Sequence, residues 1–111
     1  MRVKQGDIIK VNFDPTMGSE QGGYRPGLVV SNDFTISKTN IIAIVPITNT
    51  LSRHPFNVFL DGKTTGATTG VVECAHIRSV DLIARNFYVS DRILDEKLDE
   101  VLEVVFAMLD N

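Results

Sequence analysis

The sequence predicts an α+β fold, in which a small β-barrel of five or six short strands is followed by one C-terminal amphipathic helix. Short apolar runs, separated by turn residues, fill the first ninety positions. No long helical pattern separates these runs, which excludes the βαβ order of a parallel sheet. From about residue 95 the apolar period changes to 3.6. Because open sheet edges promote aggregation, we expect so few strands to curl into a barrel.

In the first half of the chain, three apolar runs predict strands. They are expected at residues 8–13, 28–30 and 41–47. The apolar face of the first run consists of Ile9, Val11 and Phe13. Pro15 ends this run, since proline has no backbone donor, and a polar, glycine-rich loop follows. The third run is apolar except for Pro46 near its end, so we expect a central strand that is buried on both faces. Residues 33–37 predict one helical turn, capped by Asn32 or Asp33.

In the second half, further short runs predict the remaining strands. They are expected at residues 56–60, 71–72, 75–80 and 86–89. The second and third of these form either one bent strand or two. Asp61-Gly62 predicts a tight turn, and residues 64–70 are small and polar, as in a loop.

The last part of the chain predicts a helix from about Asp95, which is a candidate N-cap. Its apolar stripe consists of Leu94, Leu98, Val101, Leu102, Val105, Met108 and Leu109. We expect this stripe to cover the barrel or a second subunit.

The size and composition are those of one globular domain over residues 1–111, with 43% hydrophobic and 23% charged residues. No apolar run approaches the ~20 residues of a membrane span, so we expect no membrane partner. The single cysteine, Cys74, cannot form an internal disulfide. We therefore expect a cytoplasmic protein.

The formal net charge of −3 is unevenly distributed. Residues 91–111 hold seven acids and two bases, whereas residues 1–90 hold nine bases and seven acids. The local field, rather than the total charge, steers a polyanion towards a protein. The charge pattern therefore permits a nucleic-acid partner without indicating one.

Most familiar chemical motifs are absent. His54, His76 and Cys74 lack metal-ligand spacing, so we expect no metal and no cofactor. The glycines of residues 18–23 lack the G-K-[ST] ending of a phosphate-binding loop, and no nucleophile signature is present.

Three polar residues at strand ends remain as a candidate anion site. Arg25 lies between the glycine-rich loop and a buried strand, Thr48 follows the central strand, and Glu20 lies in the loop. A guanidinium forms two charge-assisted bonds to a phosphate. From spacing alone, the simpler interpretations are favoured, namely a surface ion pair for Arg25, a strand-end cap for Thr48 and a solvated loop acid for Glu20. The pattern by itself thus predicts only a small β-rich domain with a candidate anion site.

An ordered series of motifs covers nearly the whole chain. It consists of G-D-I at 6–8, D-P-x-x-G-S-E-Q at 14–21, R-P at 25–26, P-I-T at 46–48, H-P-F-N-V at 54–58, G-V-V at 70–72 and I-R-S-V-D at 77–81. In this series the chain resembles the MazF/PemK-like toxins of type II toxin–antitoxin modules.

The resemblance implies an SH3-like β-barrel that forms a homodimer and cuts single-stranded RNA, mostly mRNA, at short sequence motifs without a metal. It implies a cognate antitoxin, whose acidic tail occupies the substrate groove. In the family the arginine of R-P and the threonine of P-x-T form the catalytic pair, which corresponds to Arg25 and Thr48. The loop acid corresponds to Glu20.

This chemistry suits the residue types. Metal-free RNA cleavage uses the neighbouring 2′-hydroxyl as nucleophile and passes through a phosphorane with extra negative charge. Arg25 is expected to stabilise that charge and Thr48 to position a phosphate oxygen. Glu20 is the candidate base.

Further residues are candidate RNA contacts. They are Ser19, Gln21, Asn49, Thr50, Arg53, His54, His76 and Arg78. For the last two, roles in the core or at the barrel rim are equally compatible with the sequence.

The chain departs from one branch of the family, the PemK/Kid-like toxins. That branch has an arginine and an aspartate flanking the cysteine after G-V-V and a histidine in the first loop, where this chain has Glu73, Ala75 and Ser19. The mechanism of that branch is therefore not expected here.

Two other functions remain open at this point. One is a non-catalytic toxin of the related gyrase-poison fold, and the other is an inactive, purely interacting paralogue. The presence of Arg25 and Thr48 disfavours both.

Overall fold

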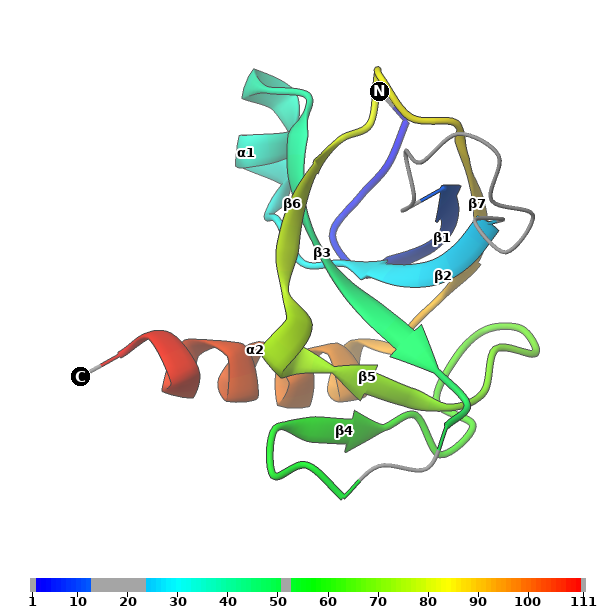
Figure 1. The fold of residues 1–111 in the computed structure, drawn as a ribbon, viewed down its shortest axis with the longest axis vertical. Helices are drawn as coiled ribbons and strands as arrows, with labels where there is room; N and C mark the ends of the chain where they lie inside the picture. The colour runs from blue at the N-terminus through cyan, green and yellow to red at the C-terminus, as the bar shows by residue number, and fades with distance from the viewer. Residues whose placement is uncertain (1, 13–23, 51–52, 111) are drawn as a thin grey trace.

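The computed structural model describes residues 2–12, 24–50 and 53–110. Its main feature is a seven-stranded antiparallel sheet with the order β4-β5-β3-β2-β1-β7, in which β6 also pairs with β3 (Figure 1). The strands are β1 (Asp7–Asn12), β2 (Tyr24–Val29), β3 (Ile41–Thr48), β4 (Asn57–Phe59), β5 (Val71–Glu73), β6 (Arg78–Asp81) and β7 (Phe87–Arg92). The helices are α1 (Asp33–Lys38), α2 (Asp95–Leu109) and the short 3₁₀ turn η1 (Cys74–His76).

The sheet curls into a barrel-like shape around β3. One edge of β3 pairs with β2, and the other pairs first with β6 and then, at Ile47 and Thr48, with β5. Figure 1 shows β6, β3, β2, β1 and β7 curving around a common interior. No strand pairing joins β6 to β7 in the described residues, so the barrel is open on that side. The predicted α+β class, with a barrel-like sheet and a C-terminal helix, is confirmed.

Two apolar clusters lie on the two sides of this sheet. The inner cluster consists of Val3, Ile9, Val11, Val29, Ile36, Ile42, Ile44, Val80 and Leu82. The helix-side cluster consists of Ile8, Leu28, Val30, Val45, Ile47, Val58, Leu60, Val72, Cys74, Ile93, Leu98, Val101 and Val105. Successive residues of β1 and of β3 therefore enter different clusters, as the alternation of a strand requires. The central strand predicted at 41–47 is thus buried on both faces, although its first residue, Ile41, is exposed.

Several predicted boundaries differ from the structure. β2 begins at Tyr24 rather than Leu28, because its first residues pair with the end of β1. β7 continues to Arg92, because its pairing with β1 persists across an irregularity between Ile8 and Ile9. The sequence left open whether residues 71–80 form one bent strand or two. The structure has two strands here, β5 and β6, separated by η1. Phe13 lies outside the described residues.

The turn predictions at two positions are confirmed. The Asn32 side chain caps α1 by accepting a hydrogen bond from the Thr35 amide at 2.8 Å. Asp61 and Gly62 both have positive φ, 54° and 73°, as a type I′ tight turn requires, and the Lys63 amide closes the turn by donating to the Leu60 carbonyl at 2.9 Å.

Helix α2 packs its predicted stripe onto the helix-side cluster. Leu98, Val101 and Val105 are buried there, whereas Leu109 at the helix end is exposed. The N-cap is Leu94 and not Asp95, so that prediction was wrong. The Leu94 carbonyl accepts the first helical bonds, while the Leu94 amide donates to the Lys63 carbonyl at 2.8 Å. Within the described residues, no helix is long and apolar enough to cross a membrane.

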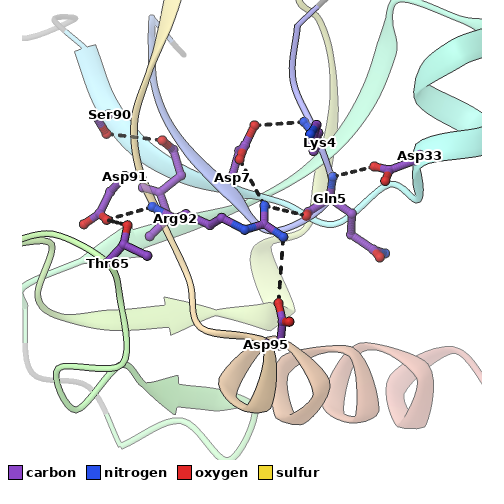
Figure 2. A network of polar contacts seen from close by, with 10 residues as sticks. Lys4, Gln5, Asp7, Asp33, Thr65, Ser90, Asp91, Arg92 and Asp95 are labelled. Carbon is purple, nitrogen blue, oxygen red and sulfur yellow. Dashed lines mark hydrogen bonds and ion pairs between the residues drawn. The ribbon is translucent and has the colours of Figure 1, made fainter.

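Arg92, at the end of β7, joins three parts of the fold (Figure 2). Its Nη1 donates to the Gln5 carbonyl and to Asp7 Oδ1, both at 3.1 Å. Its Nη2 lies 3.8 Å from Asp95 Oδ1 at the start of α2. The guanidinium thus ties the N-terminal segment and β1 to the C-terminal helix.

We expect Arg92→Met to lower the free energy of unfolding by about 1–3 kcal/mol, because it leaves the buried Asp7 carboxylate without its partner. Urea denaturation at pH 7 measures this change. Arg2→Ala, at an exposed N-terminal position, is the control and should leave the stability unchanged. Equal stability of the two variants would contradict the joining role of Arg92.

Candidate active site

Arg25 and Thr48 lie at the same end of two neighbouring strands. The paired register of β2 and β3 runs from Val29–Ile44 to Gly27–Pro46. Arg25 and Thr48 each lie two residues beyond that last pair, so both belong to the same face of the sheet. Beyond it the two strands diverge (Figure 1). Arg25 and Thr48 therefore lie on neighbouring strands just past the point where the pairing of those strands ends.

Pro26 accounts for the end of this pairing. The next pair would be Pro26–Ile47, and Pro26 has no backbone N–H to donate to the Ile47 carbonyl. Arg25 nevertheless lies within a strand, opposite Val11 of β1, and not between loop and strand as the sequence predicted. On the other side, Thr48 pairs with Val71 of β5. Arg25 is thus held in place by β1, and Thr48 is held in place by β5.

The Thr48 hydroxyl is oriented by the backbone that follows it. Its Oγ1 accepts a hydrogen bond from the Thr50 amide at 3.1 Å. A hydroxyl oxygen that accepts from an amide keeps its own hydrogen for donation. Thr48 therefore caps the end of β3, which is the structural role that spacing alone suggested. Its hydroxyl can also donate to an anion.

Gly70 brings the loop before β5 against the Thr48 backbone. It has φ +116°, and a Cβ at this position would collide with the Thr48 carbonyl oxygen and lie 2.9 Å from Asn49 Oδ1. The neighbouring Thr69 hydroxyl donates to the same Asn49 Oδ1 at 3.0 Å. Only glycine allows this close approach without strain.

Asp91 of β7 holds the same loop from the other side (Figure 2). Its carboxylate accepts from the Thr65 hydroxyl at 2.9 Å and from the Thr68 amide at 3.0 Å. Burial alone raises the pKa of Asp91, but the hydrogen bonds from Thr68, Arg92 and Thr65 outweigh it and bring the pKa well below its usual range. The ionised carboxylate therefore fixes the loop whose end contacts Thr48 and Asn49.

A cleft of about 350 Å³ opens beside these residues. It is lined by Lys10, Pro26, Asn49, Ala67, Thr68, Thr69, Ser90 and Asp91. Pro26 follows Arg25 directly and Asn49 follows Thr48 directly, so the cleft adjoins the candidate pair on both sides. Because side chains alternate along a strand, Arg25 lies on the opposite face of β2 from Pro26.

The other sequence-predicted residues are placed more widely. Asn49 and Thr50 adjoin Thr48, whereas Ser19, Glu20 and Gln21 lie outside the described residues. Arg53 and His54 are exposed before β4, where His54 Nδ1 accepts from the Phe56 amide at 3.2 Å.

His76 and Arg78 lie away from the Thr48 end of β3. Exposed His76 is 3.7 Å from Glu73 at the far end of β5. Arg78 is opposite Ile44, four residues before Thr48, which is about 13 Å along the strand. The structure therefore does not bring these two residues to the candidate pair, and RNA contacts by them stay predictions.

The described residues contain no group of three His, Cys, Asp or Glu side chains that could hold a metal ion. Cys74 is buried in the helix-side cluster, as expected of a small apolar residue, and burial raises the pKa of its thiol to about 11.

Comparison with known proteins gives a consistent result. Residues 4–109 match the family model of the PemK-like, MazF-like toxin of type II toxin–antitoxin system. The chain belongs to this family. It is 34% identical to Endoribonuclease EndoA of Bacillus subtilis, with 99% of each chain covered. It is 37% identical to Endoribonuclease toxin MazF of Escherichia coli, covering 84% of this chain and 81% of that one.

The fold of this MazF/PemK family member also matches solved structures. The crystal structure of MazF from Deinococcus radiodurans superimposes with a TM-score of 0.80 and 31% identity, covering 96% of each chain. A MazE-MazF structure from the same organism matches with a TM-score of 0.79 and 27% identity, covering 96% of this chain and 94% of that one. The resemblance found in the sequence is thereby confirmed.

Sequence reasoning missed the residues that hold Thr48 in place. Gly70 carries a weak signal, since a glycine directly before an apolar run often marks a close backbone approach. Asp91 lies within a strand, and its partners in the loop, Thr65 and Thr68, are more than twenty residues away in the chain. Such long-range partners have no local signature.

We expect Gly70→Ala to lower the free energy of unfolding by about 1–3 kcal/mol more than Gly62→Ala does. Both glycines have positive φ, but the +116° of Gly70 is farther from the left-handed region than the +73° of Gly62, and only a Cβ at Gly70 would collide with Thr48. Urea denaturation of both variants measures the difference. Equal losses would contradict the close approach of Gly70 to Thr48.

Asp91→Asn should lower the free energy of unfolding by about 1–3 kcal/mol at pH 7, because it replaces a carboxylate that accepts several hydrogen bonds. The pKa of Asp91 is lowered in the folded state, so its contribution is fully present above the unfolded-state pKa of about 3.9. It is lost as the pH falls from there towards the folded-state value.

The difference between Asp91→Asn and the parent should therefore shrink below about pH 4, in urea titrations across the pH range. Asp99→Asn, at an exposed position of α2, is the control and should show a small difference at every pH. A difference for Asp91→Asn that is constant down to pH 2 would contradict the role of its charge.

Proposed function

We propose that this chain is the endoribonuclease toxin of a type II toxin–antitoxin module. It cleaves single-stranded RNA, mainly mRNA, at a short sequence motif without a metal, and so inhibits translation and growth. The observation that carries this proposal is the position of Arg25 and Thr48, on one sheet face at the same end of β2 and β3. Relatives that are more than 30% identical are named endoribonucleases, which favours the enzyme over a non-catalytic toxin of the gyrase-poison fold.

The proposed reaction is an internal transesterification. The 2′-oxygen forms a bond to phosphorus, the bond from phosphorus to the 5′-oxygen breaks, and the products carry a 2′,3′-cyclic phosphate and a 5′-hydroxyl. Arg25 stabilises the negative charge of the phosphorane and of the leaving 5′-oxygen, which takes up a proton from water to give the 5′-hydroxyl. Thr48, oriented by the Thr50 amide, donates to a non-bridging oxygen and aligns the phosphate. Glu20 takes the proton of the 2′-hydroxyl in this proposal.

The same proposal includes the partners of the family. A MazE-MazF structure is among the folds that this chain matches, and we infer a cognate acidic antitoxin for it as well. We also infer a homodimer, because α2 leaves Phe106 and Leu109 exposed next to the helix-side cluster. The site of action is the cytoplasm, where mRNA is translated.

Arg25→Ala and Thr48→Val should each lower the rate of RNA cleavage by about 10²–10³-fold, the usual effect of losing one group that stabilises the transition state. Lys38→Ala, on the exposed surface of α1, is the control and should cleave at the parent rate. The measurement is cleavage of end-labelled RNA in EDTA. DNA of the same sequence should remain intact, since it lacks the 2′-hydroxyl.

Two outcomes would contradict the proposal. A parent protein that arrests growth but cleaves no transcript, as judged by mapping 5′ ends after brief expression, would be a binding toxin. Unchanged rates in both Arg25→Ala and Thr48→Val would show that other residues carry the catalysis.

A further inference from the structure

Two tyrosines form an exposed aromatic pair on the outer face of the sheet. The ring centroids of Tyr24 in β2 and Tyr88 in β7 are 5.7 Å apart, with an angle of 54° between the planes. The two residues are 47% and 54% exposed. The strand between them is β1, so the two rings meet above its backbone. Exposed, preorganised rings of this kind are what single-stranded nucleic acids stack on.

Lys10 places a positive charge next to this pair. In β1 it is opposite Pro26 of β2 on one side and opposite Tyr88 of β7 on the other, so the three side chains share one face. Tyr24 lies two residues before Pro26 and therefore belongs to the same face. An ammonium group beside two rings can bind the phosphate between two stacked nucleotides.

The cleft of about 350 Å³ continues this face beyond Lys10 and Pro26. Its polar lining also includes Asn49, Thr68, Thr69 and Asp91. The side-chain oxygen of Asn49, Oδ1, accepts a hydrogen bond from the Thr69 hydroxyl, so the side-chain NH₂ group of Asn49 can donate to a ligand. The ionised Asp91 carboxylate would repel a phosphate inside the cleft. The polar donors and acceptors of the cleft lining suit the edge of a nucleobase instead.

We propose that this face is a nucleotide-binding subsite for the RNA next to the scissile phosphate, in which one base enters the cleft, the next stacks on Tyr24 and Tyr88, and Lys10 binds the phosphate between them. This inference rests on the proposed function. Tyr24 directly precedes Arg25 and Asn49 directly follows Thr48, with Cα atoms of adjacent residues about 3.8 Å apart. The Arg25 and Thr48 side chains belong to the opposite face of the sheet, so an RNA strand bound on this face reaches the catalytic pair by passing over the ends of β2 and β3.

Binding to a non-cleavable oligonucleotide tests the subsite apart from catalysis. The probe is a fluorescein-labelled RNA that contains the mapped cleavage motif, with 2′-deoxy substitution at the cleaved position. Tyr24→Ala and Tyr88→Ala, in the full chain, should each weaken its binding about 5- to 150-fold, the range for losing one stacked base. Tyr24→Phe and Tyr88→Phe keep the rings and should bind within about twofold of the parent.

The control is Phe34→Ala, because Phe34 is 71% exposed on α1 and should not affect binding. Lys10→Gln should reduce the slope of log affinity against log salt by about 0.7, as expected for one phosphate contact on a single strand. In cleavage assays the tyrosine variants should raise KM and change kcat little.

Unchanged affinity and unchanged KM in Tyr24→Ala and Tyr88→Ala, with a parent that cleaves RNA, would overturn the subsite and leave the proposed function intact. So would a loss of affinity for an antitoxin peptide with no loss for the RNA probe. A loss of affinity in the phenylalanine variants equal to that in the alanine variants would also overturn it, because the rings would then not be the binding element. A parent that cleaves no RNA would instead refute the proposed function.

Discussion

The pairing of β2 with β3, and the point at which it ends, is the constraint on which the candidate site depends. Three residue pairs hold the strands together, up to Gly27–Pro46, and beyond them the strands diverge. If the ladder continued, Arg25 and Thr48 would be ordinary neighbours in a closed sheet, without room for a substrate between them. Pro26 prevents this, because it cannot supply the donor that the next pair, Pro26–Ile47, requires.

A second consequence is that β3 is free to turn towards β5 once it has left β2. The last residues of β3 pair with Val71 and Val72, and the loop before β5 is thereby brought against Thr48 and Asn49. Asp91 fixes the middle of that loop to β7, and β7 pairs with β1. The surroundings of Thr48 are therefore held from both ends of the sheet, although the chain segments involved are far apart in sequence.

The sequence predicted the architecture well where a pattern is local. The apolar periods of β1, β3 and α2, the Asn32 cap and the Asp61-Gly62 turn each depend on a few neighbouring residues, and the structure agrees with them. The start of β2 was missed, because Tyr24, Arg25 and Pro26 have no strand pattern and are held by pairing with β1. In the same way, the Tyr24–Tyr88 pair joins residues more than sixty positions apart, which no local pattern reveals. The family motifs identified Arg25 and Thr48, but only the structure shows what holds them.

A net charge of −3 does not by itself favour RNA binding, but the charges are unevenly distributed over the protein. Two acids at the start of α2 are paired with bases outside the helix, since Glu96 lies 3.6 Å from Lys63 and Asp95 lies 3.8 Å from Arg92. Such exposed pairs contribute little to stability, but they reduce the negative field of the helix. The candidate site has few cations among the described residues. Lys10 lines the cleft, and Arg25 directly precedes Pro26, which also lines it. A site with so few phosphate contacts must obtain most of its affinity from stacking and from hydrogen bonds to bases. Hydrogen bonds to base edges depend on base identity, whereas phosphate contacts do not. The small number of cations at this site therefore suits the sequence-selective ribonuclease that we propose, because a strongly basic surface would hold every RNA equally well.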